Sequence, residues 1–166
     1  MRGLILAALT LAACSNDQPP PIGDPDGSLS QFTDDAYAPP VFIDAGSDAG
    51  AAEQLDFAGS CLSGLVPVWH FFDFQTHTPG DSSLTFSAQT ADTQGALSSA
   101  PSVTLADVTG PDITTWTGVD VDPKLQSINQ QSRTYLRVTI VAQPATDGGA
   151  PVLTHYRQSY DCVVGQ

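Results

Sequence analysis

The segment Tyr135-Leu136-Arg137-Val138-Thr139-Ile140-Val141-Ala142-Gln143 carries the clearest strand pattern of this chain. Leu136, Val138 and Ile140 alternate with more polar residues, so one face of the segment is expected to be buried and the other to meet solvent. We therefore predict a β-strand from Tyr135 to Gln143 whose apolar face packs on a core.

Five further segments are rich in β-branched and aromatic residues or alternate in the same way, and each is predicted to be a strand. They comprise residues 66–76, 83–90, 102–108, 114–121 and 152–164. The segment 144–151 contains Asp147-Gly148-Gly149, which predicts a hairpin loop between the last two strands.

The segment 66–76 has apolar residues at both odd and even positions, which predicts a central strand covered on both sides. One predicted face comprises Val66, Val68, His70, Phe72 and Phe74, and the other comprises Trp69, Phe71 and Asp73.

Asp122-Pro123 predicts the start of a helix of at most two turns, with Asp122 as its cap. Short strands separated by turns rich in glycine, proline and aspartate are typical of all-β domains. We therefore predict an antiparallel β-sandwich, jelly-roll-like, with one short helix. A closed barrel is the alternative.

The chain is strongly acidic, with 5 Lys+Arg against 18 Asp+Glu and a formal net charge of −13. Such a surface repels phosphate backbones and anionic headgroups, so nucleic acid is not an expected partner. The length of 166 residues and the hydrophobic content of 41% suit one modest core.

Composition divides the chain into three parts. Residues 1–13 are predicted to be a signal peptide, because the apolar run from Leu4 to Leu11 follows Arg2 and is far shorter than the ~20 residues of a transmembrane helix. Residues 14–58 are rich in Asp, Pro, Gly and Ala, and we expect a flexible acidic tether there. Its segment 37–43 is apolar enough to dock on the domain or on a partner. The β-sandwich is expected at residues 59–166.

The sequence Leu11-Ala12-Ala13-Cys14 resembles the lipobox of bacterial lipoproteins. The resemblance implies that Cys14 is lipidated after cleavage and that the chain is anchored in a membrane of the cell envelope. Ser15 stands where enterobacterial inner-membrane lipoproteins carry aspartate, so outer-membrane delivery is favoured. An ordinary secretory signal with Cys14 as a free thiol is the alternative.

If Cys14 carries lipid, Cys61 and Cys162 remain as a pair in an oxidising compartment, which predicts a disulfide. Two separate buried thiols are the alternative. A metal site is not expected at these cysteines, because neither has a nearby cysteine or histidine partner.

The region from Cys61 onward resembles a β-sandwich module of exported proteins from predatory and gliding soil bacteria, such as myxobacteria. The resemblance rests on Val66-Pro67-Val68-Trp69, Thr78-Pro79-Gly80-Asp81-Ser82, Tyr135-Leu136-Arg137-Val138, Pro151-Val152-Leu153 and Tyr160-Asp161-Cys162. It implies a binding or spacer module and no catalytic residues.

Histidines and serines do not form a predicted catalytic or metal site. His70 and His77 face opposite sides of an extended strand and lie ~23 Å apart along it, too far to share an ion. The segment 59–64 contains glycine and serine without the spacing of a nucleophile elbow. We expect no catalytic residue, no cofactor and no resident metal; a structural calcium held by loop aspartates such as Asp120, Asp122 and Asp147 is the alternative.

Aromatic residues are the remaining candidates for ligand contact, because a sugar ring stacks on an exposed indole or phenol. The candidates are Trp69, Trp116, Tyr135, Tyr156 and Tyr160, among which Trp116 is flanked by small polar residues. Core packing of all five is the alternative.

These observations lead to two functional hypotheses. The first is a non-enzymatic, lipid-anchored envelope module that recognises or assembles with an envelope protein or glycan. The second is a carbohydrate-binding module whose contacts are Trp116, Trp69 and Tyr135.

Overall fold

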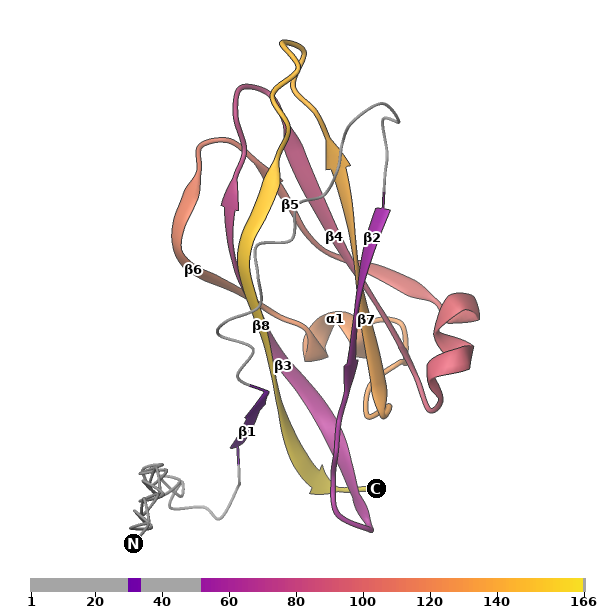
Figure 1. The fold of residues 1–166 in the computed structure, drawn as a ribbon. Helices are drawn as coiled ribbons and strands as arrows, with labels where there is room; N and C mark the ends of the chain where they lie inside the picture. Colours follow the sequence, from indigo (N-terminus) through magenta and orange to yellow (C-terminus); the bar gives the residue numbers. More distant parts are fainter. Residues whose placement is uncertain (1–29, 34–51, 166) are drawn as a thin grey trace, which may run out of the picture.

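The computed structural model describes residues 30–33 and 52–165, and it confirms the predicted all-β sandwich. Two four-stranded antiparallel sheets pack face to face (Figure 1). The first sheet has the order β1 (Ser30–Thr33), β8 (Val152–Val164), β3 (Leu65–His77) and β6 (Ile113–Asp120). The second has the order β2 (Ala52–Ala58), β7 (Tyr135–Gln143), β4 (Ser83–Ala91) and β5 (Ser102–Thr109).

The strand orders 1-8-3-6 and 2-7-4-5 are those of an eight-stranded jelly roll. Among the described strands, β4 and β5 alone follow each other within one sheet. The loop 144–151 therefore crosses from β7 in the second sheet to β8 in the first, and the predicted hairpin was wrong. A turn sequence specifies a local reversal of the chain but not the strand with which the next segment pairs.

The core lies between the two sheets and is dominated by aromatic and aliphatic side chains. Phe72 and Phe74 of β3 pack on Phe86 of β4, with ring centroids 5.6 and 4.7 Å apart. Leu136 and Ile140 of β7 are fully buried, as their alternation predicted. Burial of these aromatic and aliphatic side chains favours closing the sandwich.

Strand β3 contains a β-bulge that changes which residues face the core. Trp69 lies opposite Tyr160 and Phe72 lies opposite Gln158, so two residues of β3 oppose the single residue Ser159. Trp69 and Phe72 are consequently both buried, at 1% and 0% exposure. The predicted faces of residues 66–76 were wrong, because the sequence pattern assumed unbroken alternation.

The prediction that this strand is covered on both sides was also wrong. Its outer face, which points away from the second sheet, carries Phe71 at 48% exposure. The bulge places His70 and Phe71 together opposite Ser159 on that side.

One side chain and one backbone amide satisfy the backbone groups that the bulge removes from the regular ladder. Ser159 Oγ accepts a hydrogen bond from the Phe71 N–H at 3.1 Å. The Val121 N–H donates to the His70 carbonyl at 3.0 Å, which ties the end of β6 to the same point. These contacts fix the bulge as a defined part of the fold.

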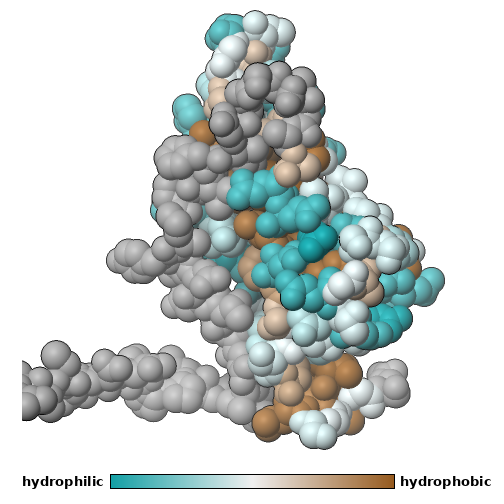
Figure 2. Space-filling view, turned by 45° about the vertical axis from the view of Figure 1, so that its right-hand side comes forward, coloured by the Kyte–Doolittle hydropathy of each residue, from teal (hydrophilic) through white to brown (hydrophobic). Residues whose placement is uncertain are grey.

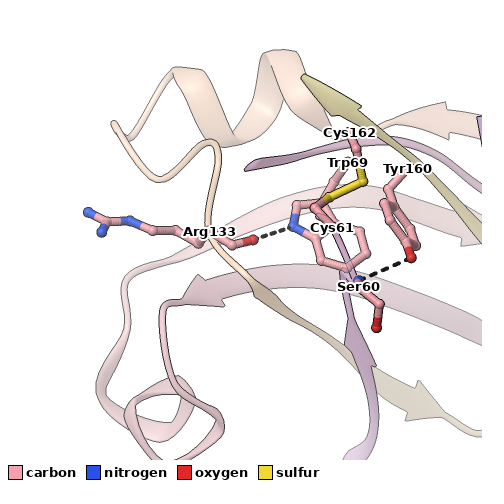
Figure 3. Close-up of a disulfide and its surroundings, with 6 residues drawn as sticks. All are labelled: Ser60, Cys61, Trp69, Arg133, Tyr160 and Cys162. Atoms are coloured by element: carbon pink, nitrogen blue, oxygen red, sulfur yellow. Dashed lines mark hydrogen bonds between the residues drawn. A yellow bond between two sulfur atoms is a disulfide. The ribbon is translucent and has the colours of Figure 1, made fainter. Parts of the chain in front are cut away.

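The predicted disulfide between Cys61 and Cys162 is present. Figure 3 shows it beside Trp69 and Tyr160, whose ring centroids are 5.2 Å apart. Trp69 Nε1 donates to the Arg133 carbonyl at 2.9 Å, and the Ser60 N–H donates to the Tyr160 hydroxyl at 3.1 Å. The bridge therefore closes a group of contacts that joins the start of β3, the end of β8 and the loop before β7.

The predicted boundary between tether and domain at residue 58 was wrong. Ala52–Ala58 form β2, which pairs with β7 along its whole length, and Ser30–Thr33 pair with β8. Asp56 accepts two hydrogen bonds from Arg137, at 2.6 and 2.7 Å, and this lowers the pKa of the Asp56 carboxyl. The sequence-based boundary failed because β2 mixes polar and small residues at its exposed positions. The rest of the predicted tether lies outside the described residues.

The predicted short helix exists as α1 (Asp122–Gln126), but its cap differs from the prediction. Val121 is the residue before the helix, and the Asp122 carboxylate accepts from the Gln126 side chain at 2.5 Å. An additional 3₁₀ helix, η1 (Gln94–Ser99), lies between β4 and β5 and was not predicted.

Hydrophobic surface gathers at one end of the sandwich, near the C-terminus, as the brown region at the bottom of Figure 2 shows. Leu62 and Val164 are 78% and 75% exposed and lie near the start of β3 and the end of β8. No helix of the described residues is long and apolar enough to cross a membrane.

Removing the disulfide is expected to destabilise the domain strongly. Cys61 and Cys162 are 101 positions apart, and the chain-entropy model gives about 4–5 kcal/mol for a loop of this length. The double variant Cys61→Ser, Cys162→Ser should lower the free energy of unfolding by that order in urea titrations. An unchanged urea midpoint would show that the bridge does not constrain the unfolded chain.

Candidate functional site

Aromatic and charged side chains from three strands lie on the outer face of the first sheet. They are Trp116 of β6, Phe71 and Asp73 of β3, and His155 and Arg157 of β8, which we call the Trp116 platform. All of them are exposed except Asp73, whose side chain is 17% exposed. Trp116 is 40% exposed, and with Phe71 it forms the apolar part of the platform.

Interactions among the side chains fix the shape of the platform. The Arg157 guanidinium carbon lies 4.7 Å from the centroid of the Trp116 ring, within the range of a cation–π contact. Arg157 Nε also donates to Asp73 Oδ2 at 2.8 Å. The His155 ring meets Trp116 edge to face, with centroids 6.2 Å apart. The indole is therefore held in one orientation while a large part of its surface stays exposed.

Strand registers explain why these side chains meet. Asp73 lies opposite Arg157 on one side and Gly118 on the other, which places the ion pair across neighbouring strands. Trp116 lies where the β3–β6 register shifts, between Thr117 opposite Phe74 and Ile113 opposite Thr76. This irregular part of β6 presents the indole to the outer face.

Gly118 leaves room for the Asp73 carboxylate. A Cβ atom at this position would collide with Asp73 Oδ1 and would lie 3.2 Å from Phe71 Cδ1. Any larger residue would therefore displace the carboxylate from Arg157. The glycine contributes to the site by its small size.

The platform offers hydrogen-bonding groups beside its aromatic surface. Among the described residues, the terminal guanidinium nitrogens of Arg157 donate no hydrogen bond, since the Asp73 contact uses Nε. Arg137, by comparison, uses both Nε and a terminal nitrogen on Asp56. Arg157 thus retains donors for a ligand next to the exposed indole.

The aromatic residues that the sequence suggested as ligand contacts lie in different parts of the structure. Trp69 is 1% exposed in the core, so its prediction as a ligand contact was wrong. Tyr135 is half-buried in β7 of the second sheet and does not share a face with Trp116. Tyr160 is buried, and Tyr156 packs edge to face on Phe57. Trp116 alone of these candidates belongs to the platform.

Sequence reasoning missed Phe71 and Arg157. Phe71 was assigned to a covered face, because the bulge is not visible in the residue pattern. Arg157 could have been noticed as one of only 5 Lys+Arg residues, placed two positions after His155 in a predicted strand.

The histidines form two separate pairs with aspartates. His70 Nε2 lies 3.0 Å from Asp161 Oδ2, and His77 Nδ1 lies 2.7 Å from Asp112 Oδ2. Hydrogen bonds from His77 and from the Thr78 N–H lower the pKa of Asp112. Within residues 30–33 and 52–165, no group of three or more metal-ligating side chains comes together.

Ser159, His70 and Asp161 lie near one another on the outer face, but no serine–histidine hydrogen bond joins them among the described contacts. Ser159 Oγ contacts the backbone N–H and carbonyl of Phe71, at 3.1 and 3.4 Å. Its hydroxyl is thus used to complete the bulge.

A groove of about 580 Å³ runs beside α1, separate from the Trp116 platform. Its lining includes the apolar Val66, Val68 and Val163 and the charged Asp122 and Arg133. Among the described residues, Arg133 forms its salt bridge with Asp92 and none with Asp122.

No protein-family model matches this chain, and no curated protein matches it significantly. The functional argument therefore rests on the site itself. Cys14 and the lipobox-like segment lie outside the described residues, so lipidation stays a prediction.

Replacing Gly118 with alanine is expected to break the Asp73–Arg157 pair, because the new methyl group occupies the space of the carboxylate. The Arg157 Nε–H resonance in NMR spectra should move toward that of an unpaired arginine. Gly95→Ala is the matched control, since nothing lies within 4 Å of its added Cβ. An Arg157 resonance that is the same in both variants would contradict this account of the site.

Proposed function

We propose that this chain is an exported, lipid-anchored, non-enzymatic recognition module of the bacterial cell envelope, and that it binds through the Trp116 platform. The observation that carries the proposal is the clustering of exposed Trp116, exposed Phe71 and incompletely paired Arg157 on one sheet face. Tryptophan and arginine are the residue types most enriched at the energetic centres of interfaces.

The outer face of the second sheet offers a contrast. Its central cation, Arg137, is satisfied by two hydrogen bonds to Asp56. The exposed large hydrophobic residues are Leu62, Phe71, Trp116, Val163 and Val164, and none of them lies on a strand of the second sheet. Within the described residues, the features of a binding surface are therefore concentrated on the first sheet.

Export is supported by the disulfide and by the lipobox-like Leu11-Ala12-Ala13-Cys14. Disulfides persist in oxidising compartments outside the cytoplasm. Lipidation at Cys14 would add several acyl chains, and two or more chains anchor a protein durably. The module would then remain at the membrane and present its first sheet to other envelope components.

A non-enzymatic role is supported by the way the polar residues of the first sheet are used. Ser159 completes the β3 bulge, and Asp73 holds Arg157. In this role, Ser159 and Asp73 maintain the shape of the binding surface and do not react with a ligand.

Binding to the native envelope should depend on the platform. The intact protein, immobilised from detergent, should retain fragments of the producing cell's envelope. Trp116→Ala should reduce this retention at least about tenfold, because loss of a central interface tryptophan commonly costs 2 kcal/mol or more. Leu62→Ala is the control, since Leu62 is 78% exposed at the end of the sandwich. Equal retention by wild type and Trp116→Ala would remove the platform from the proposal.

Anchoring should depend on Cys14. In cells fed labelled palmitate, the wild-type chain should incorporate label and sediment with membranes, whereas Cys14→Ala should do neither. Ser15→Ala serves as the neighbouring control and should behave as wild type. Label that persists in the Cys14→Ala chain would refute lipidation at this residue.

A further inference from the structure

We infer that the ligand of the Trp116 platform is an uncharged saccharide chain. This inference rests on the proposed function, since it names the ligand class of the same surface. The geometry combines an exposed indole with a carboxylate and with terminal guanidinium nitrogens that have no hydrogen-bond partner among the described residues.

The indole supplies the apolar contact that a sugar ring needs. One face of a pyranose presents C–H groups, and an exposed tryptophan buries them while the hydroxyls remain in the plane of the ring. Trp116 is already ordered by Arg157 and His155, at 4.7 and 6.2 Å. Binding therefore costs little side-chain entropy.

Asp73 and Arg157 supply the polar contacts. Asp73 Oδ2 accepts from Arg157, while Oδ1 has no partner among the described hydrogen bonds. A free carboxylate oxygen accepts a hydrogen bond from one hydroxyl, and the terminal nitrogens of Arg157 donate to a neighbouring one. Adjacent hydroxyls on one sugar ring match this pairing of an acceptor with a donor.

The surrounding charges favour a neutral sugar over an acidic one. Asp73 balances Arg157, while Asp120 lies opposite Phe71 in the register and Asp161 lies beside His70. The whole chain carries a formal net charge of −13. A uronate, sulfate or phosphate group would meet net repulsion here.

The extent of the apolar surface favours a sugar over a folded protein. A stable protein interface buries about 800 Å² on each partner around an apolar centre. The apolar part of the platform consists of Trp116 and Phe71, and the exposed neighbours Thr115, Thr117 and Asp120 are polar. A saccharide chain crossing β6 and β3 needs no larger apolar area.

The experiment compares envelope fragments treated in two ways before capture by the intact, detergent-solubilised protein. Periodate cleaves vicinal diols of sugars, and a broad protease removes proteins. We expect periodate to abolish capture and protease treatment to leave it unchanged. Capture that survives periodate but is lost with protease would overturn the saccharide inference and leave the proposed recognition function standing. No capture of untreated envelope would overturn both.

A titration then tests the chemistry of the site. The probes are the neutral hexasaccharides of cellulose, starch, xylan and mannan, whose units carry vicinal diols, with polygalacturonate and heparin as acidic probes. The chain has two tryptophans, and Trp69 is buried, so a change in indole fluorescence on binding reports Trp116. We expect at least one neutral probe to bind with a Kd below about 10 mM and to bind more tightly than either acidic probe.

Variants distinguish a sugar site from general loss of folding. Trp116→Ala should weaken binding of the neutral probe at least about tenfold, Trp116→Phe should weaken it less, and Asp73→Asn should weaken it several-fold. Val164→Ala, exposed at the far end of β8, should bind as wild type. Binding of the acidic probes alone, or neutral binding unaffected by Trp116→Ala, would overturn the inference.

Discussion

The extra residue in β3 between Trp69 and Phe72 is the constraint on which both the core and the candidate site depend. With regular alternation, only one of these two side chains could point inward. The bulge turns both into the core, where Trp69 meets Tyr160 and Phe72 meets Phe86. It also leaves Phe71 on the outer face, next to the strand that carries Trp116. One local irregularity thus buries Trp69 and Phe72 on one side and places Phe71 in the candidate site on the other.

The bulge persists because its polar groups have partners. Ser159 binds the Phe71 backbone, and Val121 donates to the His70 carbonyl. An unpaired backbone group at this point would cost about 1–3 kcal/mol, so these contacts decide whether the extra residue is tolerated. The disulfide lies beside Trp69 and joins the segment before β3 to the end of β8 (Figure 3).

The sequence predicted the regular parts of the fold well. Tyr135 to Gln143 forms β7 with the expected buried face, and the cysteine pair is bridged as expected. The failures share one physical cause: pairing partners and bulges depend on contacts between distant segments. Nothing near residues 66–76 shows that Ser159 will complete a bulge, so Phe71 was placed on the wrong face. Likewise, Ala52–Ala58 become a strand because β7 offers an edge, which local composition does not encode. Trp116 is the one residue of the candidate site that the sequence predicted. Arg157 and Asp73 come to lie beside it because of the pairing register between strands, which the sequence does not show.

The two faces of the first sheet are subject to different requirements. Inward residues such as Phe72 and Phe74 are fixed by packing, because close-packed cores penalise even small changes in volume. Trp116 is held mainly by Arg157 and His155, which are themselves exposed, so its removal leaves no cavity in the core. Trp116 can therefore be replaced while the jelly roll beneath the platform stays intact. Gly118 matters to both faces because it has no side chain. The Asp73 carboxylate can therefore reach Arg157 on the outer face while the backbone of β3, which also carries the core residues, stays in place.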